Sequence, residues 1–236
     1  MPGTLDGKLA LVTGASRGIG AATARALAAR GAHVVITART AKGLEDVEQA
    51  IFDAGGSATI APLDLTQTDA IAKLAAAVQG RWEALDVLVL GAATLGSLAA
   101  VPAIDPKELA TVLTLNVSAQ AALLTAFDPL LRKSAGARVI GLTSSVGRTP
   151  RAYWGAYGAS KAAFETLLGA YGDEVAQISR IRTAILDPGA TRTAMRARAY
   201  PGEDPASVKD PTIVGERIAD LAESGFDAGH VERIGA

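Results

Sequence analysis

The stretch Leu9-Ala10-Leu11-Val12-Thr13-Gly14-Ala15-Ser16-Arg17-Gly18-Ile19-Gly20 decides the fold of this chain. An apolar run ends at Val12, a glycine-rich turn follows, and an alanine-rich segment with helical spacing continues to Arg30. A buried strand, a glycine turn and a helix start in this order form a cradle for a dinucleotide pyrophosphate. The glycines let the backbone approach the phosphates, and the helix N-terminus supplies N–H donors and a positive dipole. The pattern therefore predicts an α/β dinucleotide-binding unit at the start of the chain.

Beyond this turn, short apolar runs alternate with longer helical patterns. We expect strands at residues 8–13, 33–38, 57–63, 86–90, 137–143, 181–186 and 230–234. We expect helices at 19–30, 42–54, 68–79, 106–133 with a break, 154–178 and 212–224. Continuous apolar strands that alternate with helices indicate a parallel sheet covered on both faces. Right-handed crossovers make such a sheet doubly wound, and one domain accounts for residues 1–236.

Turn residues agree with these boundaries. Gly31 and the pair Gly55-Gly56 stand where helices should end, since glycine accepts the left-handed conformation common after a last helical turn. Asp105-Pro106 and Asp210-Pro211 each combine a capping carboxylate with a proline at the first helical position. These pairs predict helix starts at Pro106 and Pro211.

Composition narrows the classes of partner. The net charge is −1, which gives no long-range attraction to nucleic acid or to an anionic membrane, so we expect a small-molecule partner. The chain has no cysteine and only two histidines, so we expect no disulfide and no metal site. The N-terminus lacks the basic and apolar regions of a secretory signal, and the expected location is cytoplasmic.

One uncharged segment, residues 87–104, is long enough to suggest a membrane span. Glycine, serine, threonine and proline interrupt it, and its first residues look like a short buried strand that enters a loop. We therefore expect no membrane span at this segment.

Polar and turn-forming residues recur where the predicted strands end. In an open parallel sheet, ligands bind outside the carboxyl ends of the strands, where the strand order reverses. Any one of these loops could owe its residues to turn chemistry alone. Their recurrence at one edge favours a ligand site, with candidate residues Gly14, Arg39, Asp64, Ala92, Ser144 and Pro188.

Together the motifs Thr13–Gly20, Asn116, Ser144, Tyr157-Gly-Ala-Ser-Lys161 and Pro188-Gly189 resemble the short-chain dehydrogenase/reductase family over nearly the whole chain. The glycine spacing TGxxxGxG is similar to the compact carbonyl-reductase branch. Other segments are similar to a bacterial subgroup of poorly characterised oxidoreductases: 144–148, 154–157 and 191–196. The resemblance implies a single Rossmann domain with strand order 3-2-1-4-5-6-7. It also implies a homotetramer or homodimer with the long helix 154–178 at an interface.

The residue types suit a carbonyl reduction, which needs a hydride on carbon and a proton on the developing alkoxide. Tyr157 is the candidate acid. Lys161 lies four residues later on the same helical face, and we expect its ammonium to favour the tyrosinate. Ser144 can donate a hydrogen bond to the substrate oxygen. In the family the residue that matches Asn116 anchors a water in the proton relay to the lysine.

Two neighbours compete for these roles. Ser145 is adjacent to Ser144, but the family's usual interval before Tyr157 selects Ser144, and Ser145 is expected to bond locally. Tyr153 is also a phenol but has no lysine four residues later, so it is expected to line the substrate pocket or to pack.

Charge favours NADP(H) over NAD(H). An NAD site places an acidic residue about twenty positions beyond the glycine turn, whereas a 2′-phosphate needs cations. This chain has Ala38 there, followed by Arg39, and Arg17 inside the turn adds a second charge. Asp64 matches the position that holds the adenine amino group, although capping of the next helix is nearly as good an interpretation. The expected cofactor-binding set is Gly14, Ser16, Arg17, Gly18, Ile19, Gly20, Arg39, Asp64, Leu65, Ala92, Tyr157, Lys161, Pro188, Gly189, Thr191 and Thr193.

Two segments depart from the family or vary within it. Leu90-Gly91-Ala92-Ala93 stands where the family has Asn-Asn-Ala-Gly, whose amides stabilise the central sheet and the surroundings of the cofactor ribose. Residues 190–211 follow the sixth strand and suggest a mobile lid over the substrate. Arginines in this lid and in the loop 148–151 allow an anionic substrate, although solvated loop charge is the more economical interpretation.

These observations predict an NADP(H)-dependent oxidoreductase that interconverts a carbonyl and an alcohol. The alternative is a non-catalytic dinucleotide sensor or scaffold protein. Such a protein should lack one of Ser144, Tyr157 or Lys161, and this chain has all three.

Overall fold

The computed structural model describes residues 3–235 and contains one parallel sheet. Its seven strands follow the order β3-β2-β1-β4-β5-β6-β7, and every neighbouring pair is parallel, as predicted. The central strands β1 and β4 are buried along their whole length, which explains why they are continuously apolar. The strands are β1 (Leu9–Thr13), β2 (His33–Ala38), β3 (Ser57–Pro62), β4 (Val87–Leu90), β5 (Arg138–Leu142), β6 (Arg182–Asp187) and β7 (His230–Arg233).

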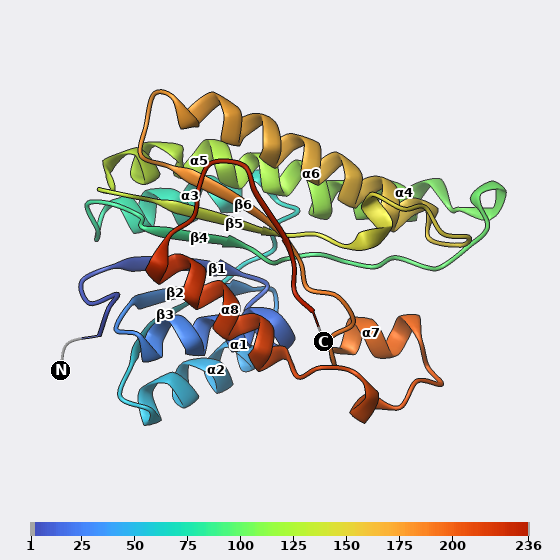
Figure 1. Cartoon of the computed structure of the whole chain (residues 1–236), viewed down its shortest axis with the longest axis horizontal. Coiled ribbons are helices and arrows are strands. Elements are labelled where there is room, and N and C mark those ends of the chain that lie inside the picture. Colours follow the sequence, from blue (N-terminus) through green and yellow to red (C-terminus); the bar gives the residue numbers. More distant parts are fainter. Residues whose placement is uncertain (1–2, 236) are drawn as a thin grey trace.

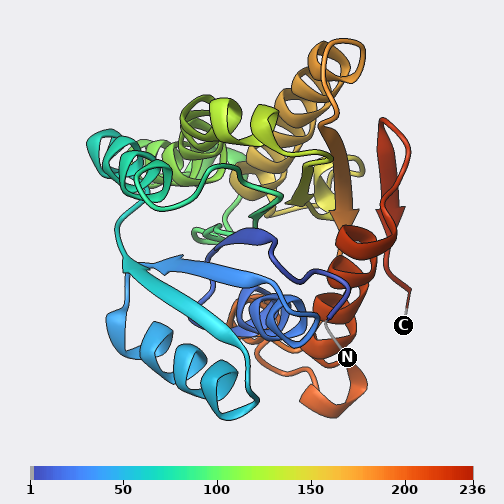
Figure 2. The ribbon, with the colours of Figure 1, turned by 90° about the vertical axis from the view of Figure 1, so that its left-hand side faces the viewer.

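Helices cover both faces of the sheet (Figure 1). One layer contains α1 (Gly18–Ala29), α2 (Ala41–Asp53) and α8 (Pro211–Ser224). The other contains α3 (Thr68–Gln79), α4 (Pro106–Leu113), α5 (Ala119–Lys133) and α6 (Gly155–Ala176). Figure 2 shows the twist of the sheet between the two layers. A short helix, α7 (Ala194–Ala199), lies apart from both layers, beside the end of the sheet (Figure 1).

The side chains of alternate strand residues pack in two separate hydrophobic cores, one on each face of the sheet. Val12 and Ile36 face the layer of α1, α2 and α8, whereas Leu11 and Val35 face the layer of α3, α5 and α6. The period of two along each strand produces this division. The cores fix the register of the strands, and the register places the carboxyl ends of β1, β4 and β5 next to one another.

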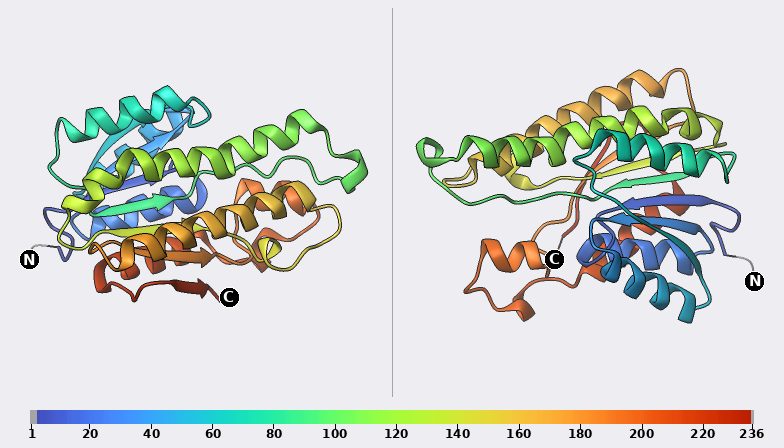
Figure 3. Two further views of the ribbon diagram at one scale, coloured as in Figure 1. Left: turned by 90° about the horizontal axis from the view of Figure 1, so that it is seen from above. Right: turned by 180° about the vertical axis from the view of Figure 1, so that it is seen from behind.

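The predicted break in helix 106–133 is absent. Instead, the helix widens into a single π turn over Thr114–Ser118 and continues into α5, so Pro106–Lys133 forms one helix (Figure 3). A π turn keeps the helix continuous while it redirects the side chains on one face, and such turns are common at functional sites. The helix starts at Pro106 and Pro211 are confirmed, with Asp105 and Asp210 as capping side chains.

The segment 87–104 forms strand β4, a loop and the short 3₁₀ turn η1 (Val101–Ala103), as the rejection of a membrane span predicted. Within residues 3–235, one helix, Pro106–Lys133, is long and apolar enough by length and composition to cross a membrane, with a mean hydropathy of 1.5. Core helices of soluble proteins pass the same test. In this structure Leu123 and Phe127 of the helix are fully buried against the sheet.

Candidate active site

The glycine turn after β1 leaves a shallow backbone cradle at the N-terminus of α1. Gly14 has φ = +70°, and a Cβ atom at this position would lie 2.9 Å from Ala92 Cα. A Cβ atom on Gly20 would lie 2.4 Å from the Gly14 carbonyl oxygen. The N-cap residue of α1, Arg17, makes no side-chain capping bond, so the first helical N–H groups are available to an anion. This geometry fits a dinucleotide pyrophosphate.

Two arginines border the cradle, as the sequence predicted. Arg17 and Arg39 are both exposed, and neither forms an ion pair or a side-chain hydrogen bond with any residue from 3 to 235. Asp64 lies close enough to Arg39 to sense its charge. The pKa of Asp64 lies below its ordinary value, first because its carboxylate accepts hydrogen bonds from the Thr66 backbone and hydroxyl and then because of Arg39.

The alternative role of Asp64 as a helix cap is wrong. The N-cap of α3 is Gln67, and Asp64 Oδ1 instead closes a turn with Thr66, at 2.9 Å from its amide nitrogen. The side chain of Leu65 is also unsuited to ligand contact, because it is buried in the core next to α3. Only the backbone of Leu65 remains available for the predicted role.

Ser144, Tyr157 and Lys161 come together at the carboxyl edge. Ser144 follows β5 and forms no side-chain hydrogen bond with the part of the chain that the structure describes. Ser145, in contrast, accepts a hydrogen bond from Arg151 at 3.2 Å. Of these two serines, Ser144 therefore has the free hydroxyl, and it is also the serine at the family's usual interval before Tyr157. Tyr157 lies in the first turns of α6 and is only 7% exposed.

Lys161 is buried, and its ammonium is directed at the backbone. Nζ donates a hydrogen bond of 2.8 Å to the Leu142 carbonyl oxygen at the end of β5 and lies 5.8 Å from the centre of the Tyr157 ring. Burial lowers the pKa of Lys161 to about 8, although the carboxylate of Glu165 opposes this shift. A pKa near 8 leaves the ammonium mostly charged at neutral pH.

The expected lowering of the pKa of Tyr157 by Lys161 is absent in this structure. Burial raises the pKa of Tyr157 above its ordinary value, and the nearby carboxylate of Asp187 raises it further. Asp187 is itself buried and accepts a hydrogen bond from the Gly189 amide nitrogen at 2.9 Å. Tyr157 is therefore a neutral phenol at physiological pH, which is the form that can donate a proton.

The buried side chain of Asn116 binds the loop after β4. Its Oδ1 accepts a hydrogen bond from the Thr94 amide nitrogen at 2.8 Å, and its Nδ2 donates to the Thr94 carbonyl oxygen at 2.9 Å and to the Ser160 hydroxyl at 3.0 Å. The Ser160 hydroxyl in turn donates to the Tyr157 carbonyl oxygen at 2.7 Å. Asn116 thus links the loop after β4 to the helix that carries Tyr157.

Gln120 is a residue of this site that the sequence analysis missed. It is 2% exposed, and its Nε2 donates to the carbonyl oxygens of Ala92 at 3.0 Å and Leu115 at 2.9 Å. The Thr13 hydroxyl accepts a hydrogen bond from the Ala92 amide nitrogen at 3.2 Å. Ala92 is thereby held on both sides, in a segment that lacks the family's asparagines. A second amide four residues after Asn116, amid aliphatic residues, was the available signal.

Residues 190–211, the predicted lid, contain α7, whose Met195 and Ala199 pack against the cluster of Tyr157, Leu95 and Val146. Thr193 caps α7, and its methyl carbon would lie 3.3 Å from a Cβ atom at Gly18. Thr191 is buried, and its hydroxyl donates to the Pro188 carbonyl oxygen at 3.1 Å. Arg198 Nη2 donates to the Gly96 carbonyl oxygen at 3.0 Å and so connects the lid to the loop after β4.

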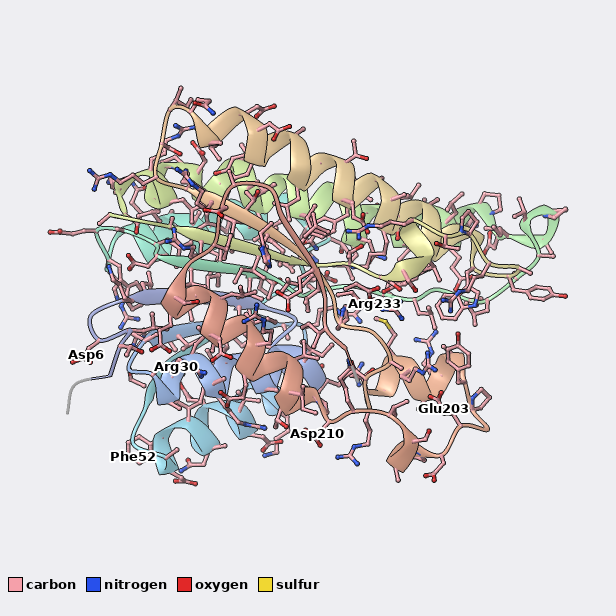
Figure 4. The ribbon with its side chains drawn as sticks, viewed as in Figure 1. Asp6, Arg30, Phe52, Glu203, Asp210 and Arg233 are labelled. Carbon is pink, nitrogen blue, oxygen red and sulfur yellow. The ribbon has the colours of Figure 1, made fainter. Side chains whose placement is uncertain are left out.

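Most arginines of the lid and of the loop 148–151 are surface charges with carboxylate partners, in agreement with the interpretation as loop charge. Arg192 pairs with Asp210, Arg196 pairs with Glu203 through two hydrogen bonds, and Arg148 pairs with Glu165. Figure 4 shows Glu203 and Asp210 in the lid segment.

The predicted packing role of Tyr153 is also wrong. It is 62% exposed and has the unusual φ of +71°, because its backbone turns the chain into α6. Its carbonyl oxygen accepts a hydrogen bond from the Ala99 amide nitrogen at 3.1 Å.

Comparison with known proteins agrees with this geometry. The profile of the short chain dehydrogenase family matches residues 8–204. The chain belongs to the short-chain dehydrogenase family. It is 37% identical over 213 residues to the uncharacterized oxidoreductase YciK of Escherichia coli, covering 89% of this chain and 84% of YciK.

Solved structures are also similar to this short-chain dehydrogenase. A short chain dehydrogenase from Shigella flexneri complexed with NADP superposes with a TM-score of 0.93 at 34% identity, covering 99% of both chains. One from Escherichia coli complexed with NADPH superposes with a TM-score of 0.91 at 34% identity, covering 99% of this chain and 98% of that one. The family and the Rossmann fold predicted from the sequence are confirmed.

Proposed function

We propose that this protein is an NADP(H)-dependent oxidoreductase that interconverts a carbonyl and an alcohol. The observation that carries the proposal is the position of Tyr157, a neutral phenol, at the same sheet edge as the glycine cradle. Tyr157 packs on Val146, two residues after Ser144, whose hydroxyl binds no residue from 3 to 235. That arrangement supplies a proton donor and an oxygen-binding group next to a dinucleotide site.

For the cofactor, the cradle of Gly14, Gly18 and Gly20 would hold the pyrophosphate. The unpaired arginines Arg17 and Arg39 would bind a 2′-phosphate, and Ala38 places no acid where an NAD site needs one. The NADP and NADPH complexes of two similar structures support this choice. The other predicted contacts, Ser16, Ile19, Asp64, Leu65, Ala92, Pro188, Gly189, Thr191 and Thr193, lie on the same edge and belong to the proposed site.

When bound, the reduced nicotinamide supplies a hydride to the carbonyl carbon. Ser144 would donate a hydrogen bond to the carbonyl oxygen and hold it beside Tyr157. The Tyr157 hydroxyl would then donate its proton to the developing alkoxide. Lys161, one helical turn after Tyr157, and a water ordered by Asn116 would then return a proton to the phenol.

The competing function is a dinucleotide sensor or scaffold protein without turnover. Oxidation of NADPH by the purified protein, followed at 340 nm with a panel of aldehydes and ketones, separates the two. We expect turnover that falls about 10²–10⁴-fold in Tyr157→Phe, the range typical of a general acid. Turnover that is unchanged in the variant would remove Tyr157 from its proposed role. Cofactor binding without turnover of any carbonyl would favour the sensor.

We also propose a homodimer or homotetramer in the cytoplasm, with α6 and the neighbouring helix Pro106–Lys133 at the subunit interface. These two helices run side by side (Figure 3), and only a third of the most apolar window of Pro106–Lys133 is buried within the chain. A second subunit would cover the remaining apolar surface. Light scattering coupled to size exclusion should give a mass at least twice the 23.9 kDa of the chain. A monomeric mass would contradict this proposal.

A further inference from the structure

A small cluster of apolar side chains surrounds Tyr157. Leu95 and Val146 are buried against it, and four half-buried side chains complete the cluster: Leu98, Trp154, Met195 and Ala199. They come from the loop after β4, the turn after β5, the N-terminus of α6 and the lid helix α7. Four separate segments therefore present hydrocarbon to the same phenol.

Two aromatic rings lie along the contacts between the lid residue Arg196 and Tyr157. Trp154 contacts Tyr157 edge to face with ring centres 6.0 Å apart, and the Tyr200 ring lies tilted by 35° against Trp154 with ring centres 5.8 Å apart. Arg196 lies 3.6 Å from the centre of the Tyr200 ring and is bound by Glu203. Two rings thus separate this guanidinium from the phenol, and a carboxylate neutralises its charge.

The remaining charges near Tyr157 disfavour an anionic group. Arg148 and Arg192 are paired with carboxylates, and the Lys161 ammonium is occupied by the Leu142 carbonyl oxygen. Arg151 is exposed and donates to the Ser145 hydroxyl, outside the apolar cluster. The buried carboxylate of Asp187 is close enough to raise the pKa of Tyr157. Asp187 has its own cationic partner, Arg233 Nε at 3.7 Å. An anion placed in this apolar cluster would lose its hydration and would find no counter-ion among the residues that form the cluster.

We propose that the substrate of this site is an uncharged carbonyl compound whose carbonyl carries an apolar aliphatic or aromatic group. The proposal rests on the proposed function, because it assumes that Tyr157 is the proton donor. The apolar group would replace contacts that Met195 and Ala199 of the lid now make with the cluster. Two lid cations are bound only to backbone carbonyls in the described chain: Arg198, which is exposed and donates to Gly96, and Lys209, which donates to the carbonyls of Ile234 and Gly235. Arg198 is the one of the two on α7, the helix that contributes to the cluster.

Matched substrates of similar size test the proposal. We expect kcat/KM with NADPH to be at least a hundredfold higher for benzaldehyde than for 4-carboxybenzaldehyde, and for hexanal than for 6-oxohexanoate. Equal values, or a preference for the carboxylates, would overturn the proposal while the turnover itself would support the proposed function. If the carboxylates are preferred, loss of that preference in Arg198→Gln would identify Arg198 as their partner.

A binding measurement decides the proposal even without turnover. The chain has two tryptophans, so Trp82→Phe leaves Trp154 as the only indole reporter. In the NADP⁺-loaded variant, benzyl alcohol should change the fluorescence of Trp154 at concentrations at least tenfold lower than 4-carboxybenzyl alcohol. No change with the uncharged alcohol, or an equal response to both, would contradict the proposal.

A pair of variants on α7 tests directly whether the apolar cluster around Tyr157 contacts the substrate. Met195→Arg places a cation in the apolar cluster, whereas Ala197→Arg places one on the exposed side of the same helix. We expect Met195→Arg to lower kcat/KM for benzaldehyde at least tenfold. The ratio of kcat/KM for benzaldehyde to kcat/KM for 4-carboxybenzaldehyde should then fall, or the order of the two substrates should reverse. Ala197→Arg should leave both values unchanged. An equal effect of the two variants would show that Met195 does not contact the substrate.

Discussion

Replacement of Lys161 by methionine should make the stability of the protein less dependent on pH. In the folded state the Lys161 ammonium has a pKa of about 8, whereas a lysine in the unfolded chain has its ordinary value of 10.5. Between these two values the unfolded state binds one more proton than the folded state. The free energy of unfolding of the wild type therefore rises with pH across this window.

The size of the effect follows from the two pKa values. Each unit corresponds to 1.36 kcal/mol, so burial of the charged ammonium costs about 3 kcal/mol below pH 8, and this cost vanishes above pH 10.5. Lys161→Met removes the cost but leaves the Leu142 carbonyl oxygen without its hydrogen bond, a loss of roughly 1–3 kcal/mol. We expect the variant to be as stable as the wild type at pH 7, or up to about 2 kcal/mol more stable, by the same balance.

Urea unfolding at several pH values between 7 and 10 provides the assay. The wild-type free energy of unfolding minus that of Lys161→Met should increase by roughly 2–3 kcal/mol over this range, since most of the window lies within it. Lys73→Met, at an exposed position of α3, is the matched control and should show a constant difference. A constant difference for Lys161→Met would refute the assignment of a buried, titrating ammonium. Activity should run the other way and fall above pH 8, because the ammonium is then lost.

Three further variants probe the cofactor side and the surroundings of Tyr157. Arg39→Asp should lower the ratio of kcat/KM for NADPH to kcat/KM for NADH by about tenfold to a hundredfold, because one charge-assisted bond to the 2′-phosphate is lost. Equal use of the two cofactors by the wild type would contradict the charge argument. Gln120→Leu should raise KM for NADPH by a larger factor than it lowers kcat, and it should lower the free energy of unfolding by roughly 1–3 kcal/mol, because the Ala92 carbonyl oxygen loses its donor. An unchanged KM would limit the role of Gln120 to packing. Asp187→Asn should lower the pKa of Tyr157, since a nearby negative charge is removed. The alkaline titration of the phenol at 295 nm, taken as the difference from Tyr157→Phe, should therefore move to lower pH. A shift to higher pH would exclude the proposed charge effect.

The fold was predictable because its signals lie between neighbours in the chain. The apolar run before Gly14 and the helical spacing after it define a strand, a turn and a helix, whatever the rest of the molecule does. The capping pairs at Pro106 and Pro211 act within a few residues and were correctly predicted. The break expected in helix 106–133 was wrong because the chain passes through a π turn at Thr114–Ser118 without ending the helix. Asn116 in that turn bonds to Thr94, a partner that lies far away in the chain.

The sequence by itself determined the α/β class and the glycine turn, since both depend on residue type and local spacing, and its resemblance to the family predicted Ser144, Tyr157 and Lys161 as candidates. Only the tertiary structure decided the environment of those residues: the neutral state of Tyr157, the engagement of Lys161 by Leu142 and the support of Ala92 by Gln120. Burial and hydrogen bonding depend on which distant segments of the chain come into contact. The pKa of a side chain is therefore set by these contacts and not by its neighbours in the sequence.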